Sequence, residues 1–384
     1  MDFSLTPEQE AIVETARRFA QNELAPGYAA RDRSGKLERH LVAAMGRLGL
    51  LGIEHPEKFG GLGGDHVTAG LALEAIAVGD FSFGYVCIMC SLGGQIIAQH
   101  AAPEVAEEWL PKLISGEKIV GIGLTEPRGG SDAAQLQLKA RREGDHYVLS
   151  GEKTSISFAT QADVVCLFVR TGSADSGAKG ITALLVPLDL PGITRTDFDD
   201  VGTRGVGRGS LFFDEVKVPV INRLGAENQG FGPVMQGFDY SRALIGLECV
   251  AIAQQSVTES WAYATERKAF GKPLSAFQGV SFPLAEAETQ LHACRLMCLQ
   301  TLWLKDQNLP HTSEAAMCKW WGPKLAFDVI HACLLTHGHG GYSKELPFQQ
   351  RLRDVMGFEI GDGMAQIMKL IIARQKVGRQ AVPA

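Results

Sequence analysis

Residues 146–170, HYVLSGEKTSISFATQADVVCLFVR, contain two short runs of β-branched and aromatic residues, with a Ser-containing break between them. Runs of this length and composition predict β-strands. Two similar runs follow at GITALLVPL (180–188) and SLFFDEVKVPV (210–220), separated by Gly, Asp and Ser residues. We therefore predict a compact central β domain over residues 119–233.

Long helical stretches flank this β domain on both sides. Near the N-terminus, Thr6, Pro7 and Gln9 form a helix-start signature of N-cap, first-turn proline and capping-box partner. We predict an N-terminal helical domain over 1–118 and a C-terminal helical bundle domain over 234–384, where the longest periodic stretches lie. The predicted fold class is mainly α with a central β domain. This order argues against a doubly wound nucleotide fold, in which strands and helices alternate throughout.

Composition and charge exclude several function classes. The chain has 384 residues, of which 45% are hydrophobic and 21% charged, as in ordinary globular proteins. Its 37 Lys and Arg against 43 Asp and Glu give a net charge of -6, so it lacks the basic footprint of a nucleic-acid-binding protein. No uninterrupted apolar run of membrane-spanning length is present, and the acidic N-terminal segment does not resemble a targeting peptide. We expect a cytoplasmic protein without membrane insertion.

The cysteines do not form a metal-binding pattern. Eight are present, mostly scattered among apolar neighbours. The one CxxC pair, Cys87 and Cys90, has no second pair elsewhere, which favours packing over a metal or redox role. We predict no metal site.

Three motifs occur along the chain at GIGLTEPRGGSD (121–132), ERKAFGKPLSAFQ (266–278) and HGHGGYSKELPFQQRLRD (337–354). Together they resemble the acyl-CoA dehydrogenase family, flavoproteins that desaturate acyl-CoA thioesters between Cα and Cβ. The resemblance covers essentially the whole chain. It implies the family fold, with an N-terminal helical domain, a β-barrel-like middle domain and a C-terminal four-helix bundle, and a homotetramer built as a dimer of dimers.

The resemblance also implies FAD as the cofactor and assigns residues to it. The first motif and the string GEKTSIS (151–157) would contribute Ile122, Leu124, Thr125, Gly130, Ser131, Ser155, Ile156 and Ser157, with Ser157 bonding the flavin near N5. Further residues would hold the dinucleotide of a neighbouring subunit's FAD, namely Arg267, Gln278, His337, Gly338, His339, Gly340 and Gly341. The C-terminal string adds Met364 and Gln366. Ser155 stands where relatives commonly carry Trp or Phe, which would open one face of the flavin.

A carboxylate is implied as the catalytic base, removing the α-proton while the β-hydride passes to flavin N5. Many relatives use a Glu in a C-terminal Y-E-G-T string, and the matching residues here are Gly361 and Asp362. We assign Asp362 as the base, although an Asp-Gly pair is also common in turns. Burial should raise its pKa toward the working pH, and its backbone N–H would stabilise the developing enolate. Some relatives place the base earlier, at the position of Ser241, which cannot serve, and nearby Glu248 is expected to pack or pair.

For the CoA ester, the resemblance implies contacts from Ser131, Asp239, Arg242 and Gly363. The apolar run at 81–95 is interpreted as part of the acyl pocket, with plain core as the alternative. Electron-transfer flavoprotein, or a similar acceptor, is the implied partner.

Two departures bear on the acyl group. Aspartate is shorter than glutamate by about 1.5 Å, and Gly361 replaces an aromatic residue, so that a bulkier acyl group would fit. Both features resemble the cyclohexanecarboxyl-CoA dehydrogenase branch, which makes an alicyclic acyl-CoA such as cyclohexanecarboxyl-CoA the favoured substrate. The alternatives are a short or branched-chain acyl-CoA dehydrogenase and a cyclohexenecarboxyl-CoA dehydrogenase that forms a diene. A nitroalkane-type flavin oxidase is the alternative from another class, and the retained CoA contacts argue against it.

Overall fold

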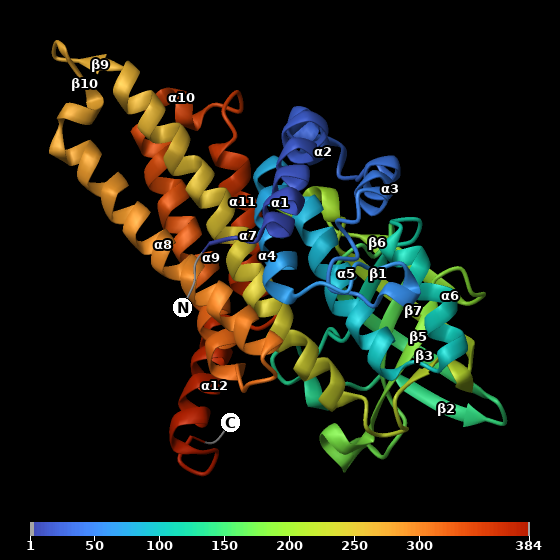
Figure 1. Cartoon of the computed structure of the whole chain (residues 1–384). Coiled ribbons are helices and arrows are strands. Elements are labelled where there is room, and N and C mark those ends of the chain that lie inside the picture. Colours follow the sequence, from blue (N-terminus) through green and yellow to red (C-terminus); the bar gives the residue numbers. More distant parts are fainter. Residues whose placement is uncertain (1–3, 383–384) are drawn as a thin grey trace.

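The computed structural model describes residues 4–382, and these residues form helices, then a sheet, then helices, as the sequence predicts (Figure 1). The first part contains α1 (Pro7–Phe19), α2 (Tyr28–Ser34), α3 (Arg39–Arg47), α4 (His66–Gly79), α5 (Phe81–His100) and α6 (Pro103–Ile114). The predicted capping box is confirmed: Thr6 Oγ1 accepts from the backbone N–H of Gln9, and the Gln9 side chain accepts from the N–H of Thr6.

The central strands form one sheet. They are β1 (Val120–Gly123), β2 (Lys139–Glu143), β3 (His146–Ile156), β4 (Val164–Arg170), β5 (Ile181–Pro187), β6 (Ile193–Asp197), β7 (Gly209–Pro219) and β8 (Arg223–Leu224). Within the described residues the order is β6-β7-β3-β2-β4-β5-β8, with β1 added in parallel beside β4. Every residue of β4 is buried, which explains its continuous apolar sequence, since a strand covered on both faces needs no polar alternation.

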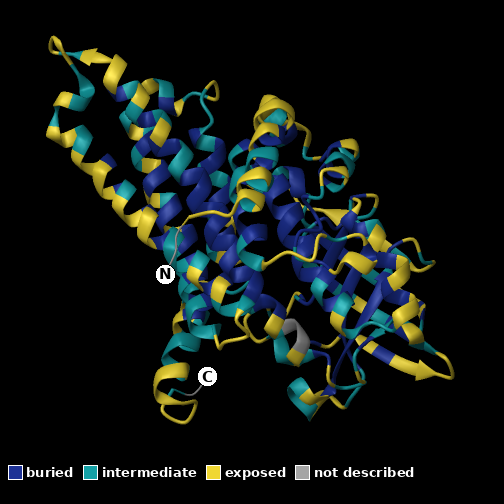
Figure 2. Cartoon of the chain, viewed as in Figure 1, coloured by how far each residue is buried: buried dark blue, intermediate teal, exposed yellow. Residues whose placement is uncertain are grey.

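The last part is a bundle of long helices. It consists of α7 (Phe231–Glu266), α8 (Gln278–Asp306), α9 (Thr312–Thr336), α10 (His339–Tyr342), α11 (Phe348–Ile360) and α12 (Ala365–Val377), with the short hairpin β9 (Lys268–Ala269) and β10 (Lys272–Pro273) after α7. Helix α7 packs on α9 and α8 within the bundle and on α4 and α5 of the first part. One continuous core therefore joins the N-terminal helices to the bundle, as the buried centre in Figure 2 shows.

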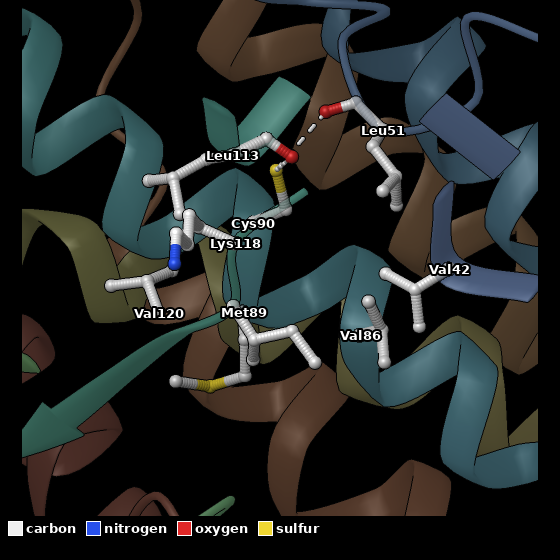
Figure 3. A pocket seen from close by; sticks show the side chains of 9 residues that line it. Val42, Leu51, Val86, Met89, Cys90, Leu113, Lys118 and Val120 are labelled. Carbon is white, nitrogen blue, oxygen red and sulfur yellow. Dashed lines mark hydrogen bonds between the residues drawn. The ribbon is translucent and has the colours of Figure 1, made fainter. Parts of the chain in front are cut away.

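Helix α5 lies at the centre of this core. It is long and apolar enough to cross a membrane by length and composition alone, yet 83% of its apolar window is buried inside the protein. A small cavity of about 10 Å³ lies against it (Figure 3), room for about one water molecule. There the Cys90 thiol donates to the carbonyl of Leu51 at 3.2 Å. Among residues 4–382, no cluster of His, Cys, Asp and Glu is placed to hold a metal ion.

Candidate active site

Two flavin-binding segments expected from the sequence lie side by side at the start of the sheet. The backbone N–H of Thr154 donates to the carbonyl of Thr125 at 2.9 Å. Behind them, the fully buried Lys153 ammonium donates to the Leu124 carbonyl at 3.0 Å and to Glu126 Oε1 at 2.7 Å. Burial lowers the pKa of Lys153 to about 8, opposed by the charge of Glu126. The pair holds the loop of the first motif on β3.

The exposed side of these segments carries hydroxyl groups suited to a polar heteroaromatic ring. Thr125, Ser131 and Ser155 are partly or fully exposed, and their hydroxyls make no hydrogen bond within the described residues. Ser155 has a φ of 57°, at an irregularity in the pairing of β3 with β7 between Lys153 and Ile156. Free hydroxyls beside an irregular strand end fit a flavin edge that needs hydrogen-bond partners.

Tyr85 of α5 connects this surface to the proposed base. Ser157 Oγ donates to Tyr85 Oη at 3.0 Å, and the Tyr85 ring packs on Phe158 and Phe358, with centroid distances of 5.8 and 5.1 Å. Burial, followed by the nearby charge of Asp362, raises the pKa of Tyr85 far above its ordinary value. The phenol therefore stays protonated and keeps a hydrogen to donate.

The base candidate Asp362 lies on the turn between α11 and α12. It is partly buried and has a left-handed φ of 53°, an unusual conformation for a residue other than glycine. Its Oδ2 lies 3.5 Å from Ser241 Oγ of α7. Burial raises the pKa of Asp362, and the charges of Lys319 and Arg242 oppose this rise. A carboxyl group whose pKa is raised is better matched to proton abstraction near neutral pH.

Lys319 of α9 holds the turn that carries Asp362. Its side chain is 1% exposed, and its ammonium donates to the carbonyls of Phe358 at 2.5 Å and Gly363 at 3.1 Å, one on each side of Asp362. Burial lowers the pKa of Lys319 to about 8, with the charge of Asp362 opposing the change. Lys319 thus fixes both the shape and the electrostatics of the turn.

The substrate candidates on α7 and the turn come together. Arg242 Nη1 donates to Asp239 Oδ1 at 2.9 Å, and Asp239 Oδ2 accepts from Thr312 Oγ1 at 2.6 Å. Arg242 is 6% exposed and its Nε has no hydrogen-bond partner within the described residues. Gly363 has a φ of 101°, a backbone conformation that strains any residue with a Cβ, and a Cβ there would also lie 2.5 Å from the terminal methyl of Met368. An unsatisfied guanidinium nitrogen beside the base is consistent with an anionic or polar ligand at this point.

The second group of FAD candidates lies elsewhere. The β9-β10 hairpin and α10 are at the far end of the bundle from the sheet (Figure 1), and Arg267 and Gln278 are exposed there. His337 does not present its ring outward: it is 6% exposed, its Nδ1 lies 2.8 Å from the Cys333 carbonyl, and it stacks on Tyr263. One chain thus does not bring the two FAD groups together.

The glycine-rich turn at 337–341 packs its backbone closely against the end of α9. A Cβ on the buried Gly341 would lie 2.0 Å from the Leu334 carbonyl, whereas one on Gly338 would meet open space. Gly338 has a φ of 58°. His339 is exposed and Gly340 is half-buried. The exposed backbone of Gly338 and His339, rather than the His337 ring, is the part of this turn free to contact a ligand.

Family models for acyl-CoA dehydrogenases match nearly the whole chain, with the N-terminal domain at 6–117, the middle domain at 121–216 and the C-terminal domain at 228–377. The chain belongs to the acyl-CoA dehydrogenase family. It is 39% identical to the probable acyl-CoA dehydrogenase YngJ of Bacillus subtilis, over 98% of this chain and 99% of that one. The predicted family fold is thereby confirmed.

Solved structures support the same assignment. Butyryl-CoA dehydrogenase from Megasphaera elsdenii matches with a TM-score of 0.95 and 31% identity, over 98% of this chain and 100% of that one. Glutaryl-CoA dehydrogenase from Mycobacterium smegmatis in complex with FADH2 matches with a TM-score of 0.91 and 27% identity, over 97% and 95%.

Sequence reasoning missed three residues of this acyl-CoA dehydrogenase site. Tyr85 appeared only within the apolar run 81–95, and nothing local marks it as a partner of Ser157. Lys319 and Lys153 read as ordinary helix and strand residues. One signal could have identified Lys319: it stands among apolar neighbours. A lysine predicted on a buried face needs a partner for its charge.

Proposed function

We propose that this enzyme desaturates an acyl-CoA thioester between Cα and Cβ, and that Asp362 is the base that removes the α-proton. The observation that carries the proposal is the Asp362 carboxyl, held on a left-handed turn by Lys319 and within reach of Ser241. FAD is the cofactor, and when bound it accepts the β-hydride. The hydroxyls of Thr125, Ser131 and Ser155 would hold its polar edge.

Each remaining residue has a defined task. Asp362 takes the α-proton onto a carboxylate oxygen. The backbone N–H of Asp362 would donate to the thioester oxygen as negative charge develops there. Arg242, held by Asp239, and the backbone of Gly363 would bind the pantetheine side. Tyr85 and Ser157 orient the part of the acyl group from which the proton and the hydride leave. The apolar helix α5 excludes water from that part of the site.

The favoured acyl group is alicyclic, as in cyclohexanecarboxyl-CoA. Gly361 has no side chain and is exposed beside the base, and the aspartate is one methylene shorter than a glutamate. Both features leave room for a ring at Cα. A linear short-chain or branched acyl group, and a cyclohexenecarboxyl group that would yield a diene, are the alternatives.

The proposed assembly follows from where the FAD residues lie. We infer a homotetramer in which Arg267, Gln278 and the turn at 337–341 reach a neighbouring chain's FAD. Electron-transfer flavoprotein is the proposed electron acceptor, and the cytoplasm the proposed location.

Anaerobic mixing of the purified flavoprotein with acyl-CoA esters tests this function. Bleaching of the flavin absorbance by cyclohexanecarboxyl-CoA, faster than by butyryl-CoA or isovaleryl-CoA, is the expected result. Bleaching by linear esters alone would overturn the alicyclic substrate. If no thioester reduced the flavin and nitroalkanes were turned over in air, the desaturase function itself would be refuted.

A further inference from the structure

Glu248 is an unsatisfied carboxyl group in the core. Its side chain is 0% exposed, and neither carboxyl oxygen has a hydrogen-bond partner within the described residues. The sequence led us to expect that it packs or pairs. It packs, but it does not pair. Because an unsatisfied buried carboxyl is costly and rare, its presence calls for a partner that the chain alone does not supply.

The position of Glu248 relates it to the active site. It follows Ser241 by seven residues on α7, which is nearly two full turns and about 10.5 Å along the axis. Both side chains therefore leave the same face of the helix. Since Ser241 reaches the base Asp362, Glu248 lies on the same face of α7, two turns from the base.

Helix α5 covers the same region from the other side. A Cβ on Gly84 would lie only 2.4 Å from Glu248 Oε1, so the carboxyl occupies the space that a side chain at position 84 would fill. The next residue is Tyr85, which bonds Ser157. Asp362 and Glu248 both raise the pKa of Tyr85 through their charges, which is consistent with Tyr85 lying near both.

Among the described residues, no basic side chain bonds Glu248. Burial raises its pKa well above the ordinary value, and the carboxylates of Asp354 and Asp80 raise it further. Both carboxyl oxygens can accept hydrogen bonds, and the group also donates one whenever it is protonated. A hydroxyl group matches the carboxyl in either state, because a hydroxyl donates one hydrogen bond and also accepts.

We propose that Glu248 is a specificity-determining residue that hydrogen-bonds a hydroxyl group on the distal part of the acyl chain or ring. The substrate class is then a hydroxylated acyl-CoA. This inference rests on the proposed function and adds a chemical requirement to it. A site built to bond a hydroxyl discriminates strongly against the analogue that lacks it, because the site group is then left unpaired.

Two pairs of esters test the inference: 4-hydroxycyclohexanecarboxyl-CoA against cyclohexanecarboxyl-CoA, and 6-hydroxyhexanoyl-CoA against hexanoyl-CoA. The measurement is kcat/KM with an artificial electron acceptor, together with the anaerobic flavin reduction rate. We expect the wild-type enzyme to prefer the hydroxylated member of at least one pair by tenfold or more. A ratio within twofold in both pairs overturns the inference without any variant, and leaves the desaturase function standing as long as the plain esters bleach the flavin. If no ester bleaches it, both proposals fail.

Two variants locate the selectivity. Glu248→Leu removes both oxygens and should reverse the preference toward the plain ester, whereas Glu248→Gln keeps polar atoms and should retain part of it. Glu248→Leu should also raise Tm, because replacing an unsatisfied buried polar group by an apolar one is neutral or stabilising. A purely structural role would instead lower Tm and leave the ratio of the two esters unchanged, which would refute the proposal. Glu107→Leu, on the exposed face of α6, is the matched control.

Discussion

Replacing Lys319 by methionine would test whether the turn around the base is tuned as the structure indicates. Methionine has a similar length and fills much of the same buried space, but it removes the ammonium that bonds the carbonyls of Phe358 and Gly363. It also removes the largest charge opposing the rise of the Asp362 pKa. The variant should therefore have a base of higher pKa on a looser turn.

The ammonium lies 3.1 Å from the carbonyl of the residue that follows Asp362, and Coulomb's law gives the order of magnitude of its effect. A unit charge on the order of 6 Å from a carboxylate contributes roughly 3 kcal/mol at an effective dielectric constant of about 20, equivalent to about 2 pH units. The acid limb of the pH–rate profile should therefore move to higher pH by roughly 1 to 2 units. Since the pKa of Lys319 is itself about 8, the native ammonium loses its charge above that pH. Above that pH, the reduction rates of the wild type and of Lys319→Met should approach each other.

The assay is the anaerobic flavin reduction rate between pH 5.5 and 9.5 at saturating acyl-CoA. Lys324→Met, on the same helix but half-exposed and paired with Asp328, serves as the control and should leave the profile in place. A profile of wild-type shape in Lys319→Met would refute the electrostatic reasoning. So would a drop of equal size at every pH, because it would reflect structural damage alone.

Three further predictions follow from the site and the core. Asp362→Asn should keep FAD bound, seen as the flavin absorbance of the purified protein, and slow reduction by acyl-CoA at least a thousandfold; a rate near wild type would exclude Asp362 as the base. Arg267→Ala should lower flavin content and, by sedimentation, weaken the proposed tetramer, whereas Lys58→Ala, at another exposed basic residue, should do neither. Burial raises the pKa of Asp354 to about 7 from 3.8, so its contribution to stability is complete below pH 3.8 and is lost as pH rises through 7, on the order of 4 kcal/mol. Asp354→Asn should therefore show a smaller fall in Tm between pH 5 and 8 than wild type, and an equal fall would contradict this assignment.

Local signals in the sequence were sufficient for the architecture. The capping box at Thr6 is a short-range pattern, and it formed as predicted. The β-branched runs became strands because both faces of the sheet centre are buried, so hydrophobicity and propensity agree there. The first motif and the GEKTSIS string lie next to each other, since the Thr125–Thr154 backbone bond joins them directly, and their contacts with FAD stay a prediction.

Contacts between distant elements were not predictable in this way. The bond between Ser157 and Tyr85 joins residues 72 positions apart, and that between Lys319 and Gly363 joins residues 44 apart. The sequence around each residue contains no pattern that indicates its partner, because the pairing is set by how α5, α9 and the sheet pack together. The ring of His337 faces the interior for a similar reason: Tyr263 stacks on it and Phe348 packs against it at a tilt, from two other helices.

The separation of the two FAD groups within one chain has a genetic consequence. Suppose that each catalytic centre combines the Asp362 surface of one subunit with the Arg267 end of another. A subunit that is defective at one of these two ends then still has an intact opposite end. Chains with Asp362→Asn and chains with Arg267→Ala, each inactive alone, would then restore some working centres when co-expressed and allowed to assemble together. Loss-of-function alleles of this enzyme would fall into two complementing groups, divided by which end of the molecule they damage.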